Sequence, residues 1–261
     1  MFHVVRKQPV PTADDFLHLA VHAGSPTVAG AFAEKGLRGA AAEKVDPETA
    51  LLLFREVYRA HLYARRLRSA HAVARKMVRL GVAHEIAHVD LGRACASLGW
   101  WSQAAQAYRI AARNAPAARR AMHWSSVAAA LHHAGQYDDA LSALERAVRW
   151  SLGSRPLHRA SMALVQLDAG VAPEELEGLG ELVGELECSR AGEGYGRYVL
   201  GLLYAARGDG NRASRHLKHF IKRNAHDPMR STTLAAELRR ARRALRELRM
   251  RDAPASPNRS G

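Results

Sequence analysis

A helical pattern that recurs about every 34 residues is the feature of this chain that most limits its fold. In three segments, a turn glycine is followed five residues later by an alanine and four residues after that by a large apolar residue. The three sets are Gly99, Ala104 and Tyr108; Gly135, Ala140 and Leu144; and Gly208, Ala213 and Leu217. Since one helical hairpin cannot bury its own apolar face, such units must stack on one another.

Signals for helices extend through almost the whole chain. Ala, Leu and Arg dominate, and no sustained apolar–polar alternation indicates strands. Asp46 followed by Pro47 marks a helix start, and Thr12 with Asp15 has the spacing of a capping box. Glycines mark the helix ends, at Gly24, Gly81, Gly99, Gly135, Gly170 and Gly208. We therefore expect hairpins that start near residues 51, 85, 121, 155 and 194.

These motifs resemble the tetratricopeptide repeat (TPR) family, whose signature is W-x₂-L-G-x₂-Y…A-x₃-F…P. Leu200-Gly201 followed by Tyr204, and the segment from Gly99 to Pro116, carry the resemblance best. Small residues in both helices of a hairpin are expected to let those helices approach closely, as at Gly92, Ala104, Gly201 and Ala213.

Two units depart from the TPR pattern. Residues 51–84 have Tyr58 at the position where the family has glycine. Residues 155–188 carry Gly178, Gly180 and Gly184 in their second helix. We expect these glycines either to permit close helix contact or to mark a softer unit, because glycine weakens a helix.

The resemblance implies an all-α fold, a right-handed superhelical array of about five TPR-like hairpins with helical caps at both ends. We expect residues 1–46 to form the N-terminal cap and residues 47–228 the repeat array. Residues 229–251, with an apolar stripe that starts at Leu234, are expected to form one basic capping helix. Residues 252–261 are expected to be a disordered tail.

In the TPR family, the first helix of each hairpin lines a concave groove. The residues expected to line it here are Arg55, Arg59, Leu62, Val89, Arg93, Ala96, Ser125, Ala129, His132, Tyr198, Leu202 and Ala205. Since arginine pairs with carboxylates through two parallel hydrogen bonds, we expect a non-enzymatic scaffold or adaptor that binds an acidic peptide or partner protein. The asparagines of the carboxylate clamp in chaperone-binding members are absent.

The formal net charge of +14 favours an anionic partner. Arginine supplies most of this excess, and coding bias in an Ala-rich chain is an alternative explanation. The charge is also uneven, because residues 160–189 hold Asp168 and six glutamates without a Lys or Arg, whereas residues 212–251 are strongly basic. A solvated acidic face and a contact with a basic surface, including one on a second copy, both explain this segregation.

Nucleic-acid binding is the second functional hypothesis. The C-terminal arginines would attract phosphates without reading sequence; they are Arg239, Arg240, Arg242, Arg243, Arg246, Arg249 and Arg251. No DNA- or RNA-binding motif accompanies them, and the aromatic residues occupy core positions of the repeats rather than alternating with basic residues. A basic helix that merely keeps the chain soluble is the simpler explanation.

A zinc hydrolase is the third hypothesis. His84-Glu85-Ile86-Ala87-His88 matches H-E-x-x-H, in which two histidines bind zinc and the glutamate activates water. No third ligand follows at a suitable spacing. Because His88 falls where the TPR family has a buried Trp, we expect a packing histidine, no metal and no cofactor.

The remaining signals concern the compartment. Cys95 and Cys188 are expected to be buried thiols in a reducing compartment. Residues 1–12 lack the apolar run of a secretory signal, and charges interrupt every apolar stretch that approaches the length of a membrane span. Phosphate-binding loops, dinucleotide fingerprints and nucleophile elbows are missing. We therefore expect a soluble, cytoplasmic protein without enzymatic activity.

Overall fold

The computed structural model describes residues 11–39 and 45–252, and all regular elements in that part of the chain are helices. The α-helices are α1 (Ala13–Val21), α2 (Pro26–Gly39), α3 (Pro47–Tyr63), α4 (Leu67–Arg79), α5 (His84–Ser97), α6 (Trp101–Asn114), α7 (Ala117–His133), α8 (Tyr137–Trp150), α9 (Arg155–Asp168), α10 (Leu179–Cys188), α11 (Gly196–Ala206), α12 (Gly210–Ala225), α13 (Pro228–Thr233) and α14 (Ala235–Asp252). Two short 3₁₀ turns, Pro173–Glu175 and Arg190–Gly192, flank α10.

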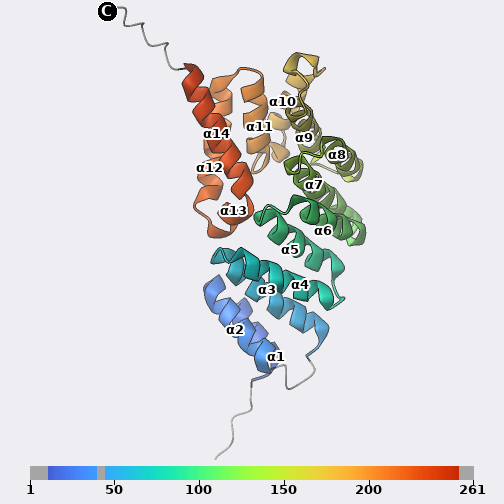
Figure 1. The fold of residues 1–261 in the computed structure, drawn as a ribbon, viewed down its shortest axis with the longest axis vertical. Helices are drawn as coiled ribbons and strands as arrows, with labels where there is room; N and C mark the ends of the chain where they lie inside the picture. Colours follow the sequence, from blue (N-terminus) through green and yellow to red (C-terminus); the bar gives the residue numbers. More distant parts are fainter. Residues whose placement is uncertain (1–10, 40–44, 253–261) are drawn as a thin grey trace, which may run out of the picture.

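Five helical hairpins follow one another along the chain: α3/α4, α5/α6, α7/α8, α9/α10 and α11/α12. Each hairpin packs on the next, so that the apolar faces are buried in a continuous stack (Figure 1). The hairpins start close to the positions expected from the glycine and alanine spacing. The predicted all-α array of TPR-like hairpins is therefore confirmed.

The helix starts near the N-terminus also agree with the sequence signals. Thr12 and Asp15 form a reciprocal capping box at α1. The side chain of Asp46 accepts hydrogen bonds from the backbone of Glu48 and Thr49 at the start of α3. Helices α1 and α2 pack on each other and on α3, the first helix of the first hairpin.

Small residues allow close helix contact in two hairpins and not in a third. A Cβ added at Gly201 would lie 2.6 Å from the side chain of Leu217, and one at Gly92 would lie 2.7 Å from Tyr108. A Cβ at Gly184 in α10 would meet nothing within 4 Å, and one at Gly180 would come no closer than 3.5 Å to a neighbour. The expectation of close contact is confirmed for Gly92 and Gly201. For Gly180 and Gly184 the structure shows no close contact, and the alternative, a softer unit, stays a prediction.

The C-terminal region differs from the single capping helix that we expected. It consists of α13 and α14, which are separated at Leu234. Helix α14 packs on α11 and α12, but α13 packs against α3 and α5 of the first two hairpins (Figure 1). Met229 joins the apolar core of the N-terminal hairpins, and Arg65 donates a hydrogen bond to Ser231 at 3.3 Å. The C-terminal segment therefore connects the last hairpin to the first.

The two cysteines lie in different environments. Cys95 is buried, and burial raises the pKa of its thiol to about 11. Cys188, at the end of α10, is exposed, so the expectation of burial is wrong for this residue. The predicted tail beyond Asp252 lies outside the described residues. Among the helices described, none has both the length and the apolar character needed to cross a membrane.

Candidate functional site

Two of the arginines predicted to line the groove are bound to one buried carboxylate. Asp90 in α5 is 2% exposed. Its carboxylate accepts hydrogen bonds from Nε of Arg55, on α3, and from Nη1 of Arg93, both at 3.0 Å. The hydroxyl of Tyr58 donates a hydrogen bond to the backbone carbonyl of Asp90 at 3.0 Å. The Arg55 contact therefore links neighbouring hairpins, whereas the Arg93 contact lies within α5. The two arginines share the single negative charge of Asp90.

Other predicted groove residues are also placed differently. Arg59 pairs with Glu56 of its own helix at 3.0 Å and does not line either of the two concavities described below. Tyr198 is 2% exposed within the C-terminal core, next to Leu238 and Ala241 of α14. Its assignment to the groove is wrong, because α14 covers the face of α11 that would line the groove in a simple array.

A cavity of about 680 Å³ lies between the inner helices and the C-terminal segment. Its walls come from α5, α7, the start of α9, and the residues around the α13–α14 junction. Five of the residues predicted for the groove line it: Val89, Arg93, Ala96, Ser125 and Ala129. We call this cavity the chamber.

A second concavity, of about 710 Å³, adjoins the chamber. One side carries arginines of α14, namely Arg239, Arg240, Arg242, Arg243 and Arg246. The other side carries Trp101, His132, His133, Tyr137 and Asp168 from the ends of α6 to α9. The predicted basic patch thus forms one wall of a cleft, and His132, predicted for the groove, belongs to the opposite wall. We call it the basic cleft.

Asp168 fixes the two walls of the basic cleft to each other. Its Oδ2 lies 2.6 Å from Nη1 of Arg240 and 2.6 Å from Nε2 of His132, and its Oδ1 accepts a hydrogen bond from Nη2 of Arg240 at 2.7 Å. Burial raises the pKa of Asp168, but the hydrogen bonds from His132 and Arg240 outweigh it and leave that pKa below its usual range. The carboxylate therefore stays charged and neutralises one arginine.

Several arginines of the cleft keep their charge available. Within residues 11–39 and 45–252, Arg239, Arg242 and Arg246 form no ion pair, and Arg243 approaches only Glu247, at 3.7 Å. Asp168 is the single acidic side chain among the lining residues. The ring of Trp101 stacks on His133 at a centroid distance of 4.5 Å, which holds an aromatic surface opposite the arginines. The arrangement suits an anionic ligand with flat or extended groups.

The H-E-x-x-H segment is engaged in packing between hairpins. Glu85 lies 2.6 Å from Nε2 of His123 and forms an ion pair with Nη2 of Arg119 at 2.8 Å, both on α7. His88 is buried, and its Nδ1 lies 2.8 Å from the carbonyl of His84, to which it donates. No three His, Cys, Asp or Glu side chains in the described part of the chain form a group able to hold a metal ion. Glu85 is thus oriented by Arg119 and His123 rather than toward His84 and His88.

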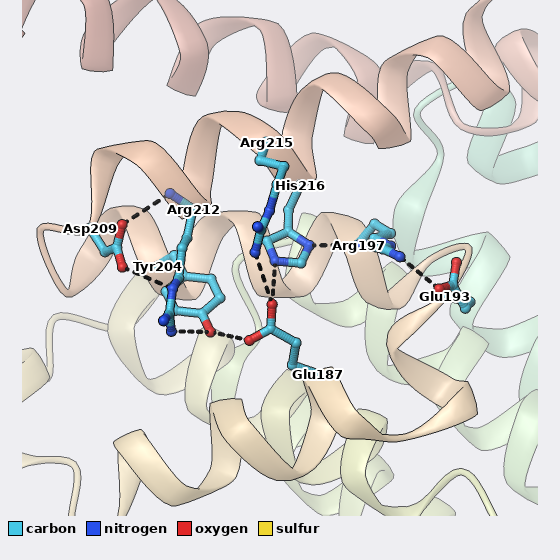
Figure 2. Close-up of polar contacts among 8 residues, drawn as sticks. All are labelled: Glu187, Glu193, Arg197, Tyr204, Asp209, Arg212, Arg215 and His216. Carbon is cyan, nitrogen blue, oxygen red and sulfur yellow. Dashed lines mark hydrogen bonds and ion pairs between the residues drawn. The ribbon is translucent and has the colours of Figure 1, made fainter.

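The acidic segment, residues 160–189, meets a basic surface of the same chain (Figure 2). Glu187 accepts hydrogen bonds from the hydroxyl of Tyr204 at 2.6 Å, Nε2 of His216 at 3.1 Å and Nη2 of Arg215 at 3.2 Å. The Tyr204 hydrogen bond contributes most to a lowered pKa of Glu187. The contact that we considered between the acidic segment and a basic surface is therefore present between α10 and α12.

Sequence reasoning missed the aromatic side of the basic cleft. Trp101 and Tyr137 each stand two residues after a turn glycine, Gly99 or Gly135, and each begins the second helix of a hairpin. This shared register position would place both rings at one edge of the array. The expectation that aromatic residues lie apart from the basic ones is wrong for these two, because α14 packs alongside that edge.

Comparison with known proteins supports the fold and no more. No family model matches the chain, and the search of curated proteins gives no match. A solved structure titled "MamA RS-1 ArsTM double mutant" superimposes with a TM-score of 0.53 at 19% sequence identity. The match covers 66% of this chain and 93% of that chain. The chain therefore has a TPR-like helical repeat fold, shared with proteins of very different sequence.

Proposed function

We propose that the chain is a TPR protein that acts as a non-enzymatic scaffold or adaptor and binds an acidic segment of a partner protein in the basic cleft. The observation that carries the proposal is the pairing of five arginines of α14 with an aromatic wall across one concavity. A fold of this type serves many functions, so the argument depends on the cleft rather than on the fold.

The composition of the cleft favours carboxylates in an extended chain. Exposed Arg242 and Arg246 lie one helical turn apart on α14, so they present two planar donors along the cleft. The guanidinium of each arginine has five N–H donors, and two of them can bind the two oxygens of an Asp or Glu side chain. The rings of Trp101 and Tyr137 add surfaces on which apolar parts of a peptide can pack. Specificity would come from the arginines, and affinity from the buried apolar contact.

The site differs from the groove that the repeat register predicts. Arg55, Arg59 and Tyr198 are paired or buried, as described above, whereas His132 and the C-terminal arginines line one concavity. The proposal therefore moves the binding surface from the first helices of the array to the junction between the array and α14.

Nucleic acid is the second candidate, favoured by one observation. Trp101 and Tyr137 lie in the same cleft as the arginines, and aromatic rings beside basic residues are the usual platform for single-stranded nucleic acid. Binding of this kind weakens steeply as salt rises, because counterions are released from the phosphates.

Titration with two probes distinguishes the candidates. Fluorescein-labelled octaglutamate and a labelled eight-nucleotide oligothymidylate would each be titrated with the full chain, and fluorescence anisotropy recorded at several salt concentrations. We expect saturable binding of the peptide that is tighter than binding of the oligonucleotide at every salt concentration. Tighter binding of the oligonucleotide, with the steeper salt dependence, would replace the scaffold proposal with nucleic-acid binding.

A further inference from the structure

The chamber has the size and lining of a small-molecule site. Its volume of about 680 Å³ falls in the range of about 300–1,000 Å³ that is typical of such sites. Small apolar residues from opposite walls leave the space open: Ala96, Ala129, Ala130, Ala235 and Ala236, with Met122, Leu157 and Leu234 around them. Larger side chains at the alanine positions would fill it.

Most charged groups in the chamber wall already have partners. Arg93 is bound to Asp90, His123 to Glu85, and His133 to Glu237. A ligand in the chamber therefore meets a wall that is largely apolar and electrically compensated. Arg239 is the exception among the charged groups, and His158 is neutral.

The ring of His158 contributes a hydrogen-bond acceptor that has no partner. Ser151 donates its hydroxyl proton to the carbonyl of Ala147 at 2.8 Å, so the 3.2 Å contact between the two serine hydroxyls requires Ser154 to donate. Ser154 then accepts from Nε2–H of His158 at 3.0 Å, which leaves Nδ1 as the unprotonated nitrogen. Nδ1 is buried and makes no hydrogen bond in the structure.

The neutral state of this ring agrees with its surroundings. His158 is 3% exposed, and burial lowers its pKa to about 4. His158 therefore adds no charge to the chamber wall.

Arg239 supplies the complementary charge. It is exposed, it lines both the chamber and the basic cleft, and it has no ion-pair partner among the residues that the structure describes. Trp101 and His133 line both concavities as well, so the chamber opens toward a positively charged mouth.

From this arrangement we infer that the chamber binds a small apolar organic anion. Its apolar body lies among the alanines, and its anionic group pairs with Arg239. This binding is separate from the docking of a partner protein in the basic cleft, and either can exist without the other.

Anilinonaphthalenesulfonate is a suitable probe, because it combines an aromatic body with one negative charge, and it fluoresces in apolar surroundings. We expect saturable fluorescence with one site per chain. In the double variant Ala96→Leu with Ala129→Leu, which fills the chamber, the affinity should fall at least tenfold. The same change at exposed Ala72 on α4 is the matched control and should leave the affinity within twofold.

Two further variants test whether the probe binds in the chamber or in the basic cleft. Arg239→Gln removes the positive charge at the mouth of the chamber, so the affinity should fall about fivefold, which is the loss of about one hydrogen bond to a charged group. Circular dichroism melting of each variant verifies the fold. If Arg242→Glu with Arg246→Glu abolishes the fluorescence while the chamber-filling variant retains it, the probe binds in the basic cleft and the inference is overturned. Octaglutamate binding in the chamber-filling variant reports separately on the proposed function.

Discussion

Arg55 of α3 and Asp90 of α5 stand 35 residues apart in the sequence, about one repeat, and their Nε and Oδ2 atoms lie 3.0 Å apart. Two further contacts have nearly the same sequence spacing: Glu85 with Arg119, and His132 with Asp168. The repeat period therefore brings opposite charges of successive hairpins together. Arg55 and His132, two of the side chains that the repeat pattern predicted for partner binding, belong to these pairs, which link successive hairpins.

Loss of Asp90 should destabilise the fold. Asp90→Ala leaves Arg55 and Arg93 without their shared partner, and because both arginines are partly exposed we expect a loss of about 2 kcal/mol in the free energy of unfolding. Urea denaturation measures it. Arg59→Ala, which breaks an exposed pair on the same helix as Arg55, should change the stability by less than about 0.5 kcal/mol. Equal effects of the two substitutions would contradict a structural role for Asp90.

Two glycine substitutions should act in opposite directions. Gly201→Ala places a methyl group 2.6 Å from Leu217, so the hairpin must open, and we expect a loss of about 1–3 kcal/mol. Gly184→Ala in α10 meets open space, and we expect a gain of about 0.5–1 kcal/mol from the better helix former. Thermal unfolding of both variants checks this, and a stabilising Gly201→Ala would show that the helices are not in close contact there.

The stability should fall in mild acid through His158. An unfolded histidine takes up a proton below about pH 6.5, whereas folded His158 stays neutral down to a pH of about 4. The unfolded state then binds more protons, so the free energy of unfolding decreases as the pH falls between these values, by up to about 3 kcal/mol. His158→Gln cannot titrate, so it should lose less stability than the wild type between pH 7 and pH 4.5 in urea denaturation. Equal losses would mean that His158 is not neutral in the folded chain.

Asp168 should determine how firmly α14 is held. Asp168→Ala removes the carboxylate that binds both Arg240 and His132, so α14 should open more often. We expect hydrogen exchange of the backbone amides in the first half of α14 to rise about tenfold, which corresponds to about 1.4 kcal/mol. Amides of α4, far from the substitution along the chain, serve as the internal reference. Unchanged exchange in α14 would show that packing on α11 and α12 alone holds it.

The array itself was predictable, because the glycine, alanine and large apolar residues recur at fixed intervals that depend on contacts within one hairpin. Gly92 and Gly201 illustrate this, since each faces a side chain of its own hairpin. The repeat pattern predicts contacts between sequence neighbours, but it does not predict the contacts that the C-terminal segment makes with distant hairpins.

The path of the C-terminal segment illustrates that limit. The apolar stripe that starts at Leu234 predicts one helix, yet the chain breaks at that residue and α13 returns to α3 and α5. Because α14 then covers α11, Tyr198 becomes a core residue, and Trp101 and Tyr137 come to face arginines that are distant in sequence. Neither outcome follows from local pattern, since both depend on where α14 packs.

The central claim is that acidic peptide binds in the basic cleft rather than to the positive charge of the chain in general. The most direct measurement compares the octaglutamate affinity of two double variants by anisotropy: Arg242→Glu with Arg246→Glu, and Arg75→Glu with Arg79→Glu. Both pairs are exposed, stand one helical turn apart and change the net charge equally, but the second pair lies on α4, outside the cleft. We predict at least a tenfold loss for the cleft variant and less than a threefold loss for the α4 variant. Equal losses in the two variants would contradict the claim.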